Sequence, residues 1–302
     1  MADRKPNPKK QARAEKAQRH TEQMAARFGK EVERSLAGVQ RLEAPVTSEV
    51  EGRVPEVRVM AADAVAAILE NGRGRAEYCD LAVLDFASFT NPGGGYIRGS
   101  WAQEEALCAE SFLYNVLEKQ GDWYGANRRR NINCNLYRNR ALVVPKVRFA
   151  REKIHAYADV LVVAAPNARR AREEYKVADD ALVRAMRDRI RFALDIVDAL
   201  GHKQVVLGAW GCGVFGWEAE LVSELFREEL ASGSHGIELA IFAVPRDRFN
   251  ENLACFEHAL STFPERNQVS FADALAERRA AEQAAAAVEE DDEEEDDWRK
   301  YL

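Results

Sequence analysis

The feature that most constrains the fold is one stretch in which a predicted strand runs into a glycine turn and then into a helix. Leu81–Phe86 is an apolar run of strand length and strand composition. The segment Asn91–Gly95 (NPGGG) then interrupts any regular element, and from Trp101 apolar residues recur at helical spacing. Successive glycines expose backbone N–H groups and permit close approach of a ligand. Because a helix N-terminus favours anions, the stretch predicts a phosphate-type site.

A second glycine-rich loop, Gly211–Gly216 (GCGVFG), also follows a predicted strand, at Gln204–Trp210. Strand and helix patterns alternate along the body of the chain, which predicts an α/β fold of three layers with helices on both faces of the sheet. Ligands bind beyond the carboxyl ends of strands in open α/β sheets. We therefore expect the two glycine loops to serve one site.

The remaining elements are predicted from hydrophobic periodicity and from Gly and Pro positions. Further strands are expected at Val54–Met60, Ala141–Pro145, Asp159–Pro166 and Ile237–Val244. Helices are expected at Gln11–Leu42, Ala61–Leu69, Leu182–Leu200, Glu218–Leu230, Asn250–Leu260 and Phe271–Val288. Gly121–Asn139 is expected to be a long polar loop. Its Arg128, Arg129 and Arg130 are either solvated or available to a polyanionic substrate.

Charge is distributed unevenly along the 302 residues, whose net charge is −7. The first 30 residues carry nine Lys/Arg against three acids, and residues 271–302 carry twelve acids against four bases. The mildly acidic body argues against a nucleic-acid-binding domain. The basic segment is either a solvated helix packed on the domain or an arm for nucleic acid or nuclear import. The acidic run Glu289–Asp297 is expected to be a disordered interaction tail without a catalytic role.

The five cysteines are scattered, without a closely spaced Cys/His cluster. This pattern favours small buried side chains over a disulfide framework or a zinc site. No apolar run reaches membrane-spanning length, and the polar N-terminus does not have the apolar core of a secretory signal. We expect a soluble protein of the cytoplasm or nucleus that requires no metal or cofactor.

Three motifs in order carry a family resemblance: NPGGG, then QEEALC (Gln103–Cys108), then GAWGCGVF (Gly208–Phe215). They resemble the signature of microbial-type, macrodomain-type poly(ADP-ribose) glycohydrolases, over about Arg58–Phe263. The resemblance implies a three-layer α/β/α macrodomain-like mixed sheet with an N-terminal helical extension and an acidic C-terminal tail. The implied domains are a basic extension at 1–45, a catalytic domain at 46–265, and a helical then acidic tail at 266–302.

The resemblance implies hydrolysis of ribose–ribose O-glycosidic bonds in poly(ADP-ribose), with release of ADP-ribose. It assigns Glu105 as the general acid and Glu104 as the group that holds ribose hydroxyls, while Gln103 orders the loop. Adjacent helical side chains point about 100° apart, so these two glutamates are not expected to face the same atom. A single general acid with an oxocarbenium-like transition state fits such a pair better than two carboxylates that flank the bond.

Several residues of the predicted site have a structural alternative. Asp63 either binds the adenine amino group or caps a helix. Asn91 either binds the distal ribose or completes a turn. Phe215 packs against a ribose or into the core. The predicted binding set is Asp63, Asn91, Gly93, Gly94, Gly95, Gln103, Gly211, Cys212, Gly213, Val214, Phe215 and Gly216.

Two other functions remain open from the sequence. The chain would be an ADP-ribose-binding reader module if the glutamates face away from the ligand. It would be a hydrolase of mono-ADP-ribosylated protein or nucleic acid if its substrate is not the polymer. The partner in each case is poly(ADP-ribose) or an ADP-ribosylated macromolecule, with only weak interactions expected from the basic arm or the acidic tail.

Overall fold

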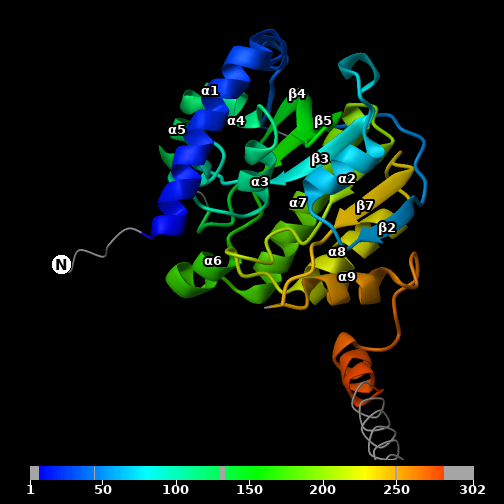
Figure 1. The fold of residues 1–302 in the computed structure, drawn as a ribbon. Coiled ribbons are helices and arrows are strands. Elements are labelled where there is room, and N and C mark those ends of the chain that lie inside the picture. The colour runs from blue at the N-terminus through cyan, green and yellow to red at the C-terminus, as the bar shows by residue number, and fades with distance from the viewer. Residues whose placement is uncertain (1–6, 44, 130–132, 249, 282–302) are drawn as a thin grey trace, which may run out of the picture.

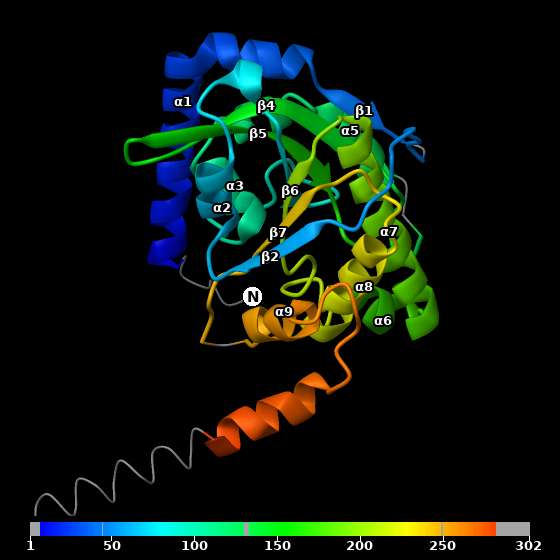
Figure 2. The same cartoon turned by 90° about the vertical axis from the view of Figure 1, so that its right-hand side faces the viewer.

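A mixed seven-stranded sheet with helices on both faces forms the body of the protein (Figures 1 and 2). The structure is a computed structural model, and it describes residues 7–43, 45–129, 133–248 and 250–281. The strand order is β1-β4-β5-β3-β6-β7-β2. The strands are β1 (Gln40–Leu42), β2 (Glu56–Met60), β3 (Leu81–Phe86), β4 (Ala141–Arg151), β5 (Ile154–Val163), β6 (Gln204–Leu207) and β7 (Leu239–Ala243). The predicted three-layer α/β architecture is confirmed.

The central strand β3 is parallel to both of its neighbours, β5 and β6. It reads LAVLDF, and its first five residues are buried because both faces of the sheet are covered. Leu81 is paired with Gln204 of β6, so β3 and β6 end at the same edge of the sheet. The two glycine loops leave these adjacent strand ends, as the order of the elements predicts.

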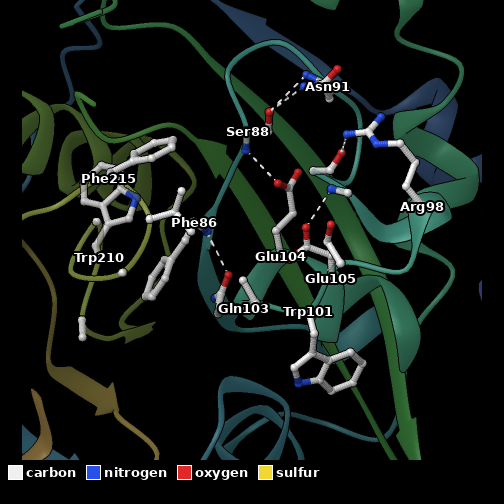
Figure 3. A pocket seen from close by; sticks show the side chains of 18 residues that line it. Phe86, Ser88, Asn91, Arg98, Trp101, Gln103, Glu104, Glu105, Trp210 and Phe215 are labelled. Atoms are coloured by element: carbon white, nitrogen blue, oxygen red, sulfur yellow. Dashed lines mark hydrogen bonds between the residues drawn. The ribbon is translucent and has the colours of Figure 1, made fainter. Parts of the chain in front are cut away.

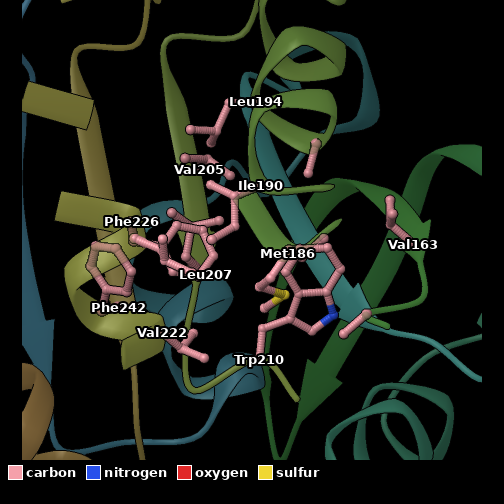
Figure 4. Close-up of a cluster of buried hydrophobic side chains, with 14 of the residues drawn as sticks. Val163, Met186, Ile190, Leu194, Val205, Leu207, Trp210, Val222, Phe226 and Phe242 are labelled. Atoms are coloured by element: carbon pink, nitrogen blue, oxygen red, sulfur yellow. The ribbon is translucent and has the colours of Figure 1, made fainter. Parts of the chain in front are cut away.

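Two apolar layers enclose the sheet, one on each face. One face is covered by α1 (Pro8–Ala37), α2 (Ala64–Asn71), α3 (Gln103–Ala109), α4 (Leu113–Leu117) and α5 (Gly121–Arg129). The other face carries α7 (Asp179–Ala199), α8 (Ala219–Ala231) and α9 (Asn252–Leu260), with α6 (Ala168–Tyr175) beside them. Figure 4 shows the second layer, where Met186 and Ile190 of α7 meet Trp210 and Phe226. Two short 3-10 helices, η1 (Ala76–Tyr78) and η2 (Tyr96–Arg98), complete the fold.

Three sequence predictions about secondary structure were wrong. The N-terminal helix ends at Ala37, and the residues up to Leu42 pair with β4 as strand β1. The expected loop from Gly121 begins as α5, because Trp123 and Tyr124 are buried in the apolar layer and tertiary packing overrides weak helix propensity. The strand expected to end at Pro145 continues across a bulge between Val144 and Val147 into a long antiparallel hairpin with β5.

The chain beyond the sheet is helical over residues 271–281, and this segment extends away from the body (Figures 1 and 2). The acidic run Glu289–Asp297 and the first six residues lie outside the described residues. Within the described ranges, every helix is too short or too polar to cross a lipid bilayer.

Candidate active site

The two glycine loops line one cavity of about 400 Å³ at the carboxyl ends of β3 and β6. The first loop is residues 87–102 and the second is residues 208–218; these are named loop 1 and loop 2 below. Both glutamates of α3 reach the same cavity (Figure 3). The predicted site residues in its lining are Asn91, Gly94, Gly95, Gln103, Glu104, Glu105, Gly211, Gly213, Val214 and Phe215.

Gly94 is the point at which the two glutamates and loop 1 meet. Its φ is +60°, and a Cβ atom there would lie 2.6 Å from Oε1 of Glu105 and 2.7 Å from Oε2 of Glu104. The Gly95 amide donates to Oε1 of Glu105 at 2.7 Å, and the Ser88 amide donates to Oε2 of Glu104 at 2.7 Å. The carboxylates thus diverge toward different amides, as helix geometry predicts, yet both border Gly94. Only glycine fits this position without displacing a carboxylate.

Gln103 connects α3 to the end of the central strand. Its side-chain amide donates to the Leu84 carbonyl at 2.8 Å, and its side-chain oxygen accepts from the Phe86 amide at 2.9 Å. These two bonds engage the last three residues of β3, beyond the part of the strand that pairs with β6. The position of Glu104 and Glu105 is therefore fixed relative to the strand.

Helix α1 holds the outer side of loop 1. Arg13 donates from Nε to the Gly99 carbonyl at 2.8 Å, and Nδ1 of His20 lies 3.0 Å from the Tyr96 hydroxyl. Gly99 has a φ of +75°, and a Cβ atom there would lie 1.9 Å from the Lys10 carbonyl oxygen. The helix and the loop are thus in backbone contact, and the N-terminal helix supports loop 1 from outside the described lining of the cavity.

Loop 2 differs from loop 1, because one of its glycines is closely packed and another lies in open space. Gly211 has a φ of +81° and packs where a Cβ atom would lie 2.6 Å from Cδ1 of Trp217. A Cβ atom at Gly213 would meet nothing within 4 Å, and Val214 is 73% exposed. Phe215 is partly buried beside Tyr137, with ring centroids 6.4 Å apart. The outer half of loop 2 therefore presents backbone to the cavity without side chains packed over it.

Asp85 is a buried acid behind the glutamates that the sequence analysis did not select. It is fully buried in β3, and neither of its carboxylate oxygens has a hydrogen-bond partner among the described residues. Burial raises the pKa of Asp85 well above its ordinary value, and the charge of Glu105 raises it further. The signal in the sequence was an aspartate inside an otherwise apolar six-residue strand.

Glu104 shares this environment. Burial and then the charge of Asp85 raise the pKa of Glu104 well above its ordinary value, against the hydrogen bond from the Ser88 amide. Its Oε1 has no partner within the described part of the chain. Two such carboxyl groups side by side disfavour each other's ionisation. The wall of the cavity therefore holds two buried acids whose protonated forms are favoured, next to Glu105, which is itself only 6% exposed.

The structure places four predicted site residues elsewhere than in the described lining of the cavity. Asp63 caps α2, where it accepts from the Ala66 amide at 2.8 Å and pairs with Arg151 at 2.9 Å. Gly93 of loop 1 packs against α4, where a Cβ atom would lie 2.7 Å from Tyr114. The other two are Cys212 and Gly216, both in loop 2.

Asn91 and Arg128 are linked at the rim of the cavity. Arg128 donates to the Thr90 carbonyl at 2.9 Å and to the side-chain oxygen of Asn91 at 3.3 Å. The Asn91 side chain also donates to the hydroxyls of Ser88 and Thr90. Arg128 of α5, one arginine of the predicted polyanion-facing group, thus contacts loop 1, while Arg130 lies outside the described residues.

One cluster of the described residues has ligand atoms close enough for a metal ion: Asp195, Asp198 and His235, within 4.8 Å of one another. His235 precedes β7, so the cluster lies at the opposite ends of the strands from the cavity. Its ring already contacts two carboxylates, Asp198 at 2.8 Å and Glu229 at 3.3 Å. The arrangement is that of a buried ion cluster in which the imidazole occupies the position between the acids.

The sequence matches the family described as "Microbial-type PARG, catalytic domain" over residues 9–152. The match begins within α1, earlier than the resemblance from Arg58 onward that the motifs indicate. No curated protein matches the sequence.

Solved structures of poly(ADP-ribose) glycohydrolases resemble most of this chain. The poly(ADP-ribose) glycohydrolase from Thermomonospora curvata superposes with a TM-score of 0.70 and 26% identity, over 82% of this chain and 98% of that one. The same enzyme bound to the inhibitor ADP-HPD gives a TM-score of 0.68 at 26% identity, with the same coverage of both chains. The Deinococcus radiodurans poly(ADP-ribose) glycohydrolase in complex with ADP-ribose gives 0.66 and 26%, over 76% of this chain and 97% of that one.

Proposed function

The chain belongs to the microbial-type poly(ADP-ribose) glycohydrolase family, and from this premise we propose that it hydrolyses the ribose–ribose O-glycosidic bonds of poly(ADP-ribose) and releases ADP-ribose. The observation that carries the proposal is the single cavity in which two glycine loops and two adjacent glutamates meet. A diphosphate sugar needs backbone donors for its phosphates and a proton donor at its anomeric oxygen. The lining supplies both kinds of group.

In the proposed reaction Glu105 protonates the departing oxygen while the bond from that oxygen to the anomeric carbon breaks. The ribose passes through an oxocarbenium-like state, and water adds to the anomeric carbon from the side of the pyrophosphate. A proton of that water restores the acid form of Glu105. The hydrogen bond from the Gly95 amide orients this carboxyl group, because it holds one oxygen at 2.7 Å and leaves the other for substrate.

Glu104 is proposed to hold ribose hydroxyl groups. Its raised pKa supports this role, because a protonated carboxyl group both donates to and accepts from hydroxyls. Asp85 lies behind it and shares the proton. This division assigns binding to the more deeply buried glutamate and proton transfer to Glu105.

The pyrophosphate is proposed to lie on loop 2, against the backbone of Gly213 and Val214. Nothing packs within 4 Å of a Cβ position at Gly213, so its backbone is accessible to phosphate oxygens. Phe215 provides an aromatic surface at the same end of the cavity. Gly93, Cys212 and Gly216 are proposed to act indirectly, by setting the conformation of the two loops. For Asp63, which caps α2, a contact with adenine stays a proposal.

The partner is proposed to be poly(ADP-ribose) or an ADP-ribosylated macromolecule, and the compartment the cytoplasm or nucleus. The five cysteines support such a compartment, because all are free in the structure, as in a reducing environment.

The experiment is product analysis on purified poly(ADP-ribose) with the wild type, Glu105→Gln and Glu118→Gln. Glu118 follows α4 outside the cavity and is the matched control. Glu105→Gln is expected to lose about 1,000-fold in ADP-ribose release, with calorimetric ADP-ribose binding near the wild-type value. A wild type that binds ADP-ribose and releases nothing would make the chain a reader. Release only from mono-ADP-ribosylated protein would assign the alternative hydrolase activity.

A further inference from the structure

Trp101 is an exposed aromatic side chain beside the catalytic glutamates. Its residue is 62% exposed, although it lies only two positions before Gln103. Trp123, Trp210 and Trp217 are each at most 5% exposed, so Trp101 is exceptional among the tryptophans that the structure describes. An exposed indole at the rim of a cavity leaves apolar surface in water, and such surface is typical of a site that a ligand covers when it binds.

Trp101 and Phe215 belong to opposite ends of the site. Phe215 comes from loop 2 and Trp101 from loop 1, and Figure 3 shows them on opposite sides of Gln103. With the pyrophosphate of the terminal unit on loop 2, the group that leaves from the distal ribose departs on the side of Glu105 and Trp101. This step rests on the proposed function.

A second, smaller cavity adjoins the first at Trp101. Its volume is about 40 Å³, and Ser100 and Trp101 line both cavities. The opposite wall is α1, which contributes Arg13, Lys16 and His20. Arg13 and Lys16 are exposed, and Arg98 stands at the rim of the larger cavity. An exposed indole can stack on a nucleobase, and the neighbouring cations can bind phosphates. This surface therefore suits a ligand that contains both groups.

We propose that Trp101, together with Lys16 and Arg98, forms a binding subsite for the adenosine diphosphate part of the preceding unit of the polymer, the unit whose ribose hydroxyl is released. The base of that unit is attached to the same ribose that carries the scissile oxygen. It is therefore one sugar ring away from the proton donor. Trp101 stacks on the adenine, while the cations of α1 and of η2 face the phosphates.

The subsite gives the basic N-terminal segment a role in substrate binding. Arg13 is fixed by its bond to the Gly99 carbonyl, so α1 and Trp101 keep one geometry. The enzyme would then favour oligomers over substrates with a small leaving group. Free ADP-ribose does not extend into the subsite, so its affinity should not depend on the residues of the subsite.

The test compares two substrates with the full-length chain: ADP-ribose oligomers of at least three units, and ADP-ribose that carries a simple alcohol on its distal ribose. Trp101→Ala is expected to raise KM for oligomers roughly tenfold, the factor that corresponds to the lower part of the range for one base stacked on an aromatic ring. KM for the alcohol derivative and Kd for ADP-ribose should not change. Trp101→Phe should retain most of the oligomer preference. Tyr78→Ala is the matched control, because Tyr78 is 64% exposed and is absent from the described lining of both cavities.

Binding without turnover gives an independent readout. In a Glu105→Gln background, an ADP-ribose dimer should bind more tightly than ADP-ribose and should quench the emission of the exposed indole, and both effects should vanish with Trp101→Ala. Equal oligomer KM for the wild type and Trp101→Ala, or an unchanged dimer preference in the inactive background, would overturn the subsite. Absence of turnover by the wild type would instead refute the proposed function, and the dimer titration would still decide the subsite.

Discussion

Two buried acidic clusters lie at opposite ends of the same sheet, and their electrostatics are opposite. Near the cavity, Asp85 and Glu104 are buried with unpartnered carboxylate oxygens among the described residues, and burial raises the pKa of both. Near the start of β7, Asp198 and Glu229 are equally buried, but each contacts His235. The environment therefore favours protonated carboxyl groups in the first cluster, and the charged forms of Glu229 and His235 in the second.

The partners account for the difference. Burial raises the pKa of Glu229, but hydrogen bonds from His235 and Arg191 outweigh it and lower the value to about 2. Burial lowers the pKa of His235, but the hydrogen bonds to Asp198 and Glu229 raise it to about 9. Asp85 has no such cation beside it in the part of the chain that the structure describes. Buried acids with hydrogen-bonded cationic partners stabilise a fold. Buried acids without such partners lower its stability and are typical of functional sites.

The largest expected effect comes from removing the cation of the partnered cluster. His235→Ala leaves Asp198 and Glu229 buried with one fewer positive group. We expect the free energy of unfolding to fall by about 3–5 kcal/mol, as for other broken buried ion pairs. Urea unfolding measures it. His258→Ala, which loses a hydrogen bond to the Val269 carbonyl, should cost only about 1 kcal/mol. Equal losses for the two variants would show that the cluster is not an ion cluster.

The pH dependence of stability should show the same cluster. The folded-state pKa of His235, about 9, exceeds its unfolded value, so its contribution is complete below about pH 6.5 and is lost as pH rises through 9. The groups that face it are Asp195, Asp198 and Glu229, with Arg191 behind Glu229. We expect the wild type to lose on the order of 3 kcal/mol relative to His235→Ala between pH 6 and pH 10. A constant difference over this range would contradict the assignment.

Gly94→Ala tests whether loop 1 and the glutamates form one unit. The new Cβ would lie within 2.7 Å of both carboxylates, and the φ of +60° disfavours alanine. We expect a loss of about 2 kcal/mol in unfolding free energy and loss of turnover. Gly121→Ala is the control, because a Cβ there meets nothing within 4 Å and Gly121 is absent from the described lining of the cavity. Retained turnover in Gly94→Ala would show that the carboxylates move freely.

Asp85→Asn should have the smallest effect and the opposite sign. A carboxyl group whose folded pKa is raised destabilises the fold as pH rises above its unfolded pKa, so replacing it with a neutral amide should gain stability at pH 8 and nothing at pH 3. Asp198→Asn should lose stability at pH 8, because Asp198 accepts from the Gly236 amide and contacts His235. A loss of stability at pH 8 in both variants would remove the contrast between the clusters.

The backbone of the site could be predicted from sequence because strong local signals define it. The strand Leu81–Phe86 has the predicted boundaries, since an apolar run of strand length is bounded by turn residues. The Gly201 and Gly72 helix ends are likewise local signals. Helix α5 could not be predicted from its own composition, because its formation depends on burying Trp123 and Tyr124 against residues far away in sequence.

Side-chain environments were harder to predict than the loops. The sequence placed two glutamates at the site, but the burial of Asp85 next to them depends on the packing of β3 between β5 and β6. Asp63 illustrates the reverse: its two predicted roles share one sequence pattern, and only the coordinates reveal its bonds to the Ala66 amide and to Arg151. Pairing partners that are distant in sequence decide such cases.

The most direct test of the central claim, that Glu105 supplies the proton to the leaving oxygen, uses a leaving group that does not need one. Turnover of poly(ADP-ribose) is compared with turnover of ADP-ribose carrying a nitrophenyl group on the distal ribose, for the wild type and Glu105→Gln. The account predicts a loss of about 1,000-fold on the polymer and less than about tenfold on the nitrophenyl derivative. An equal loss on both substrates would contradict it.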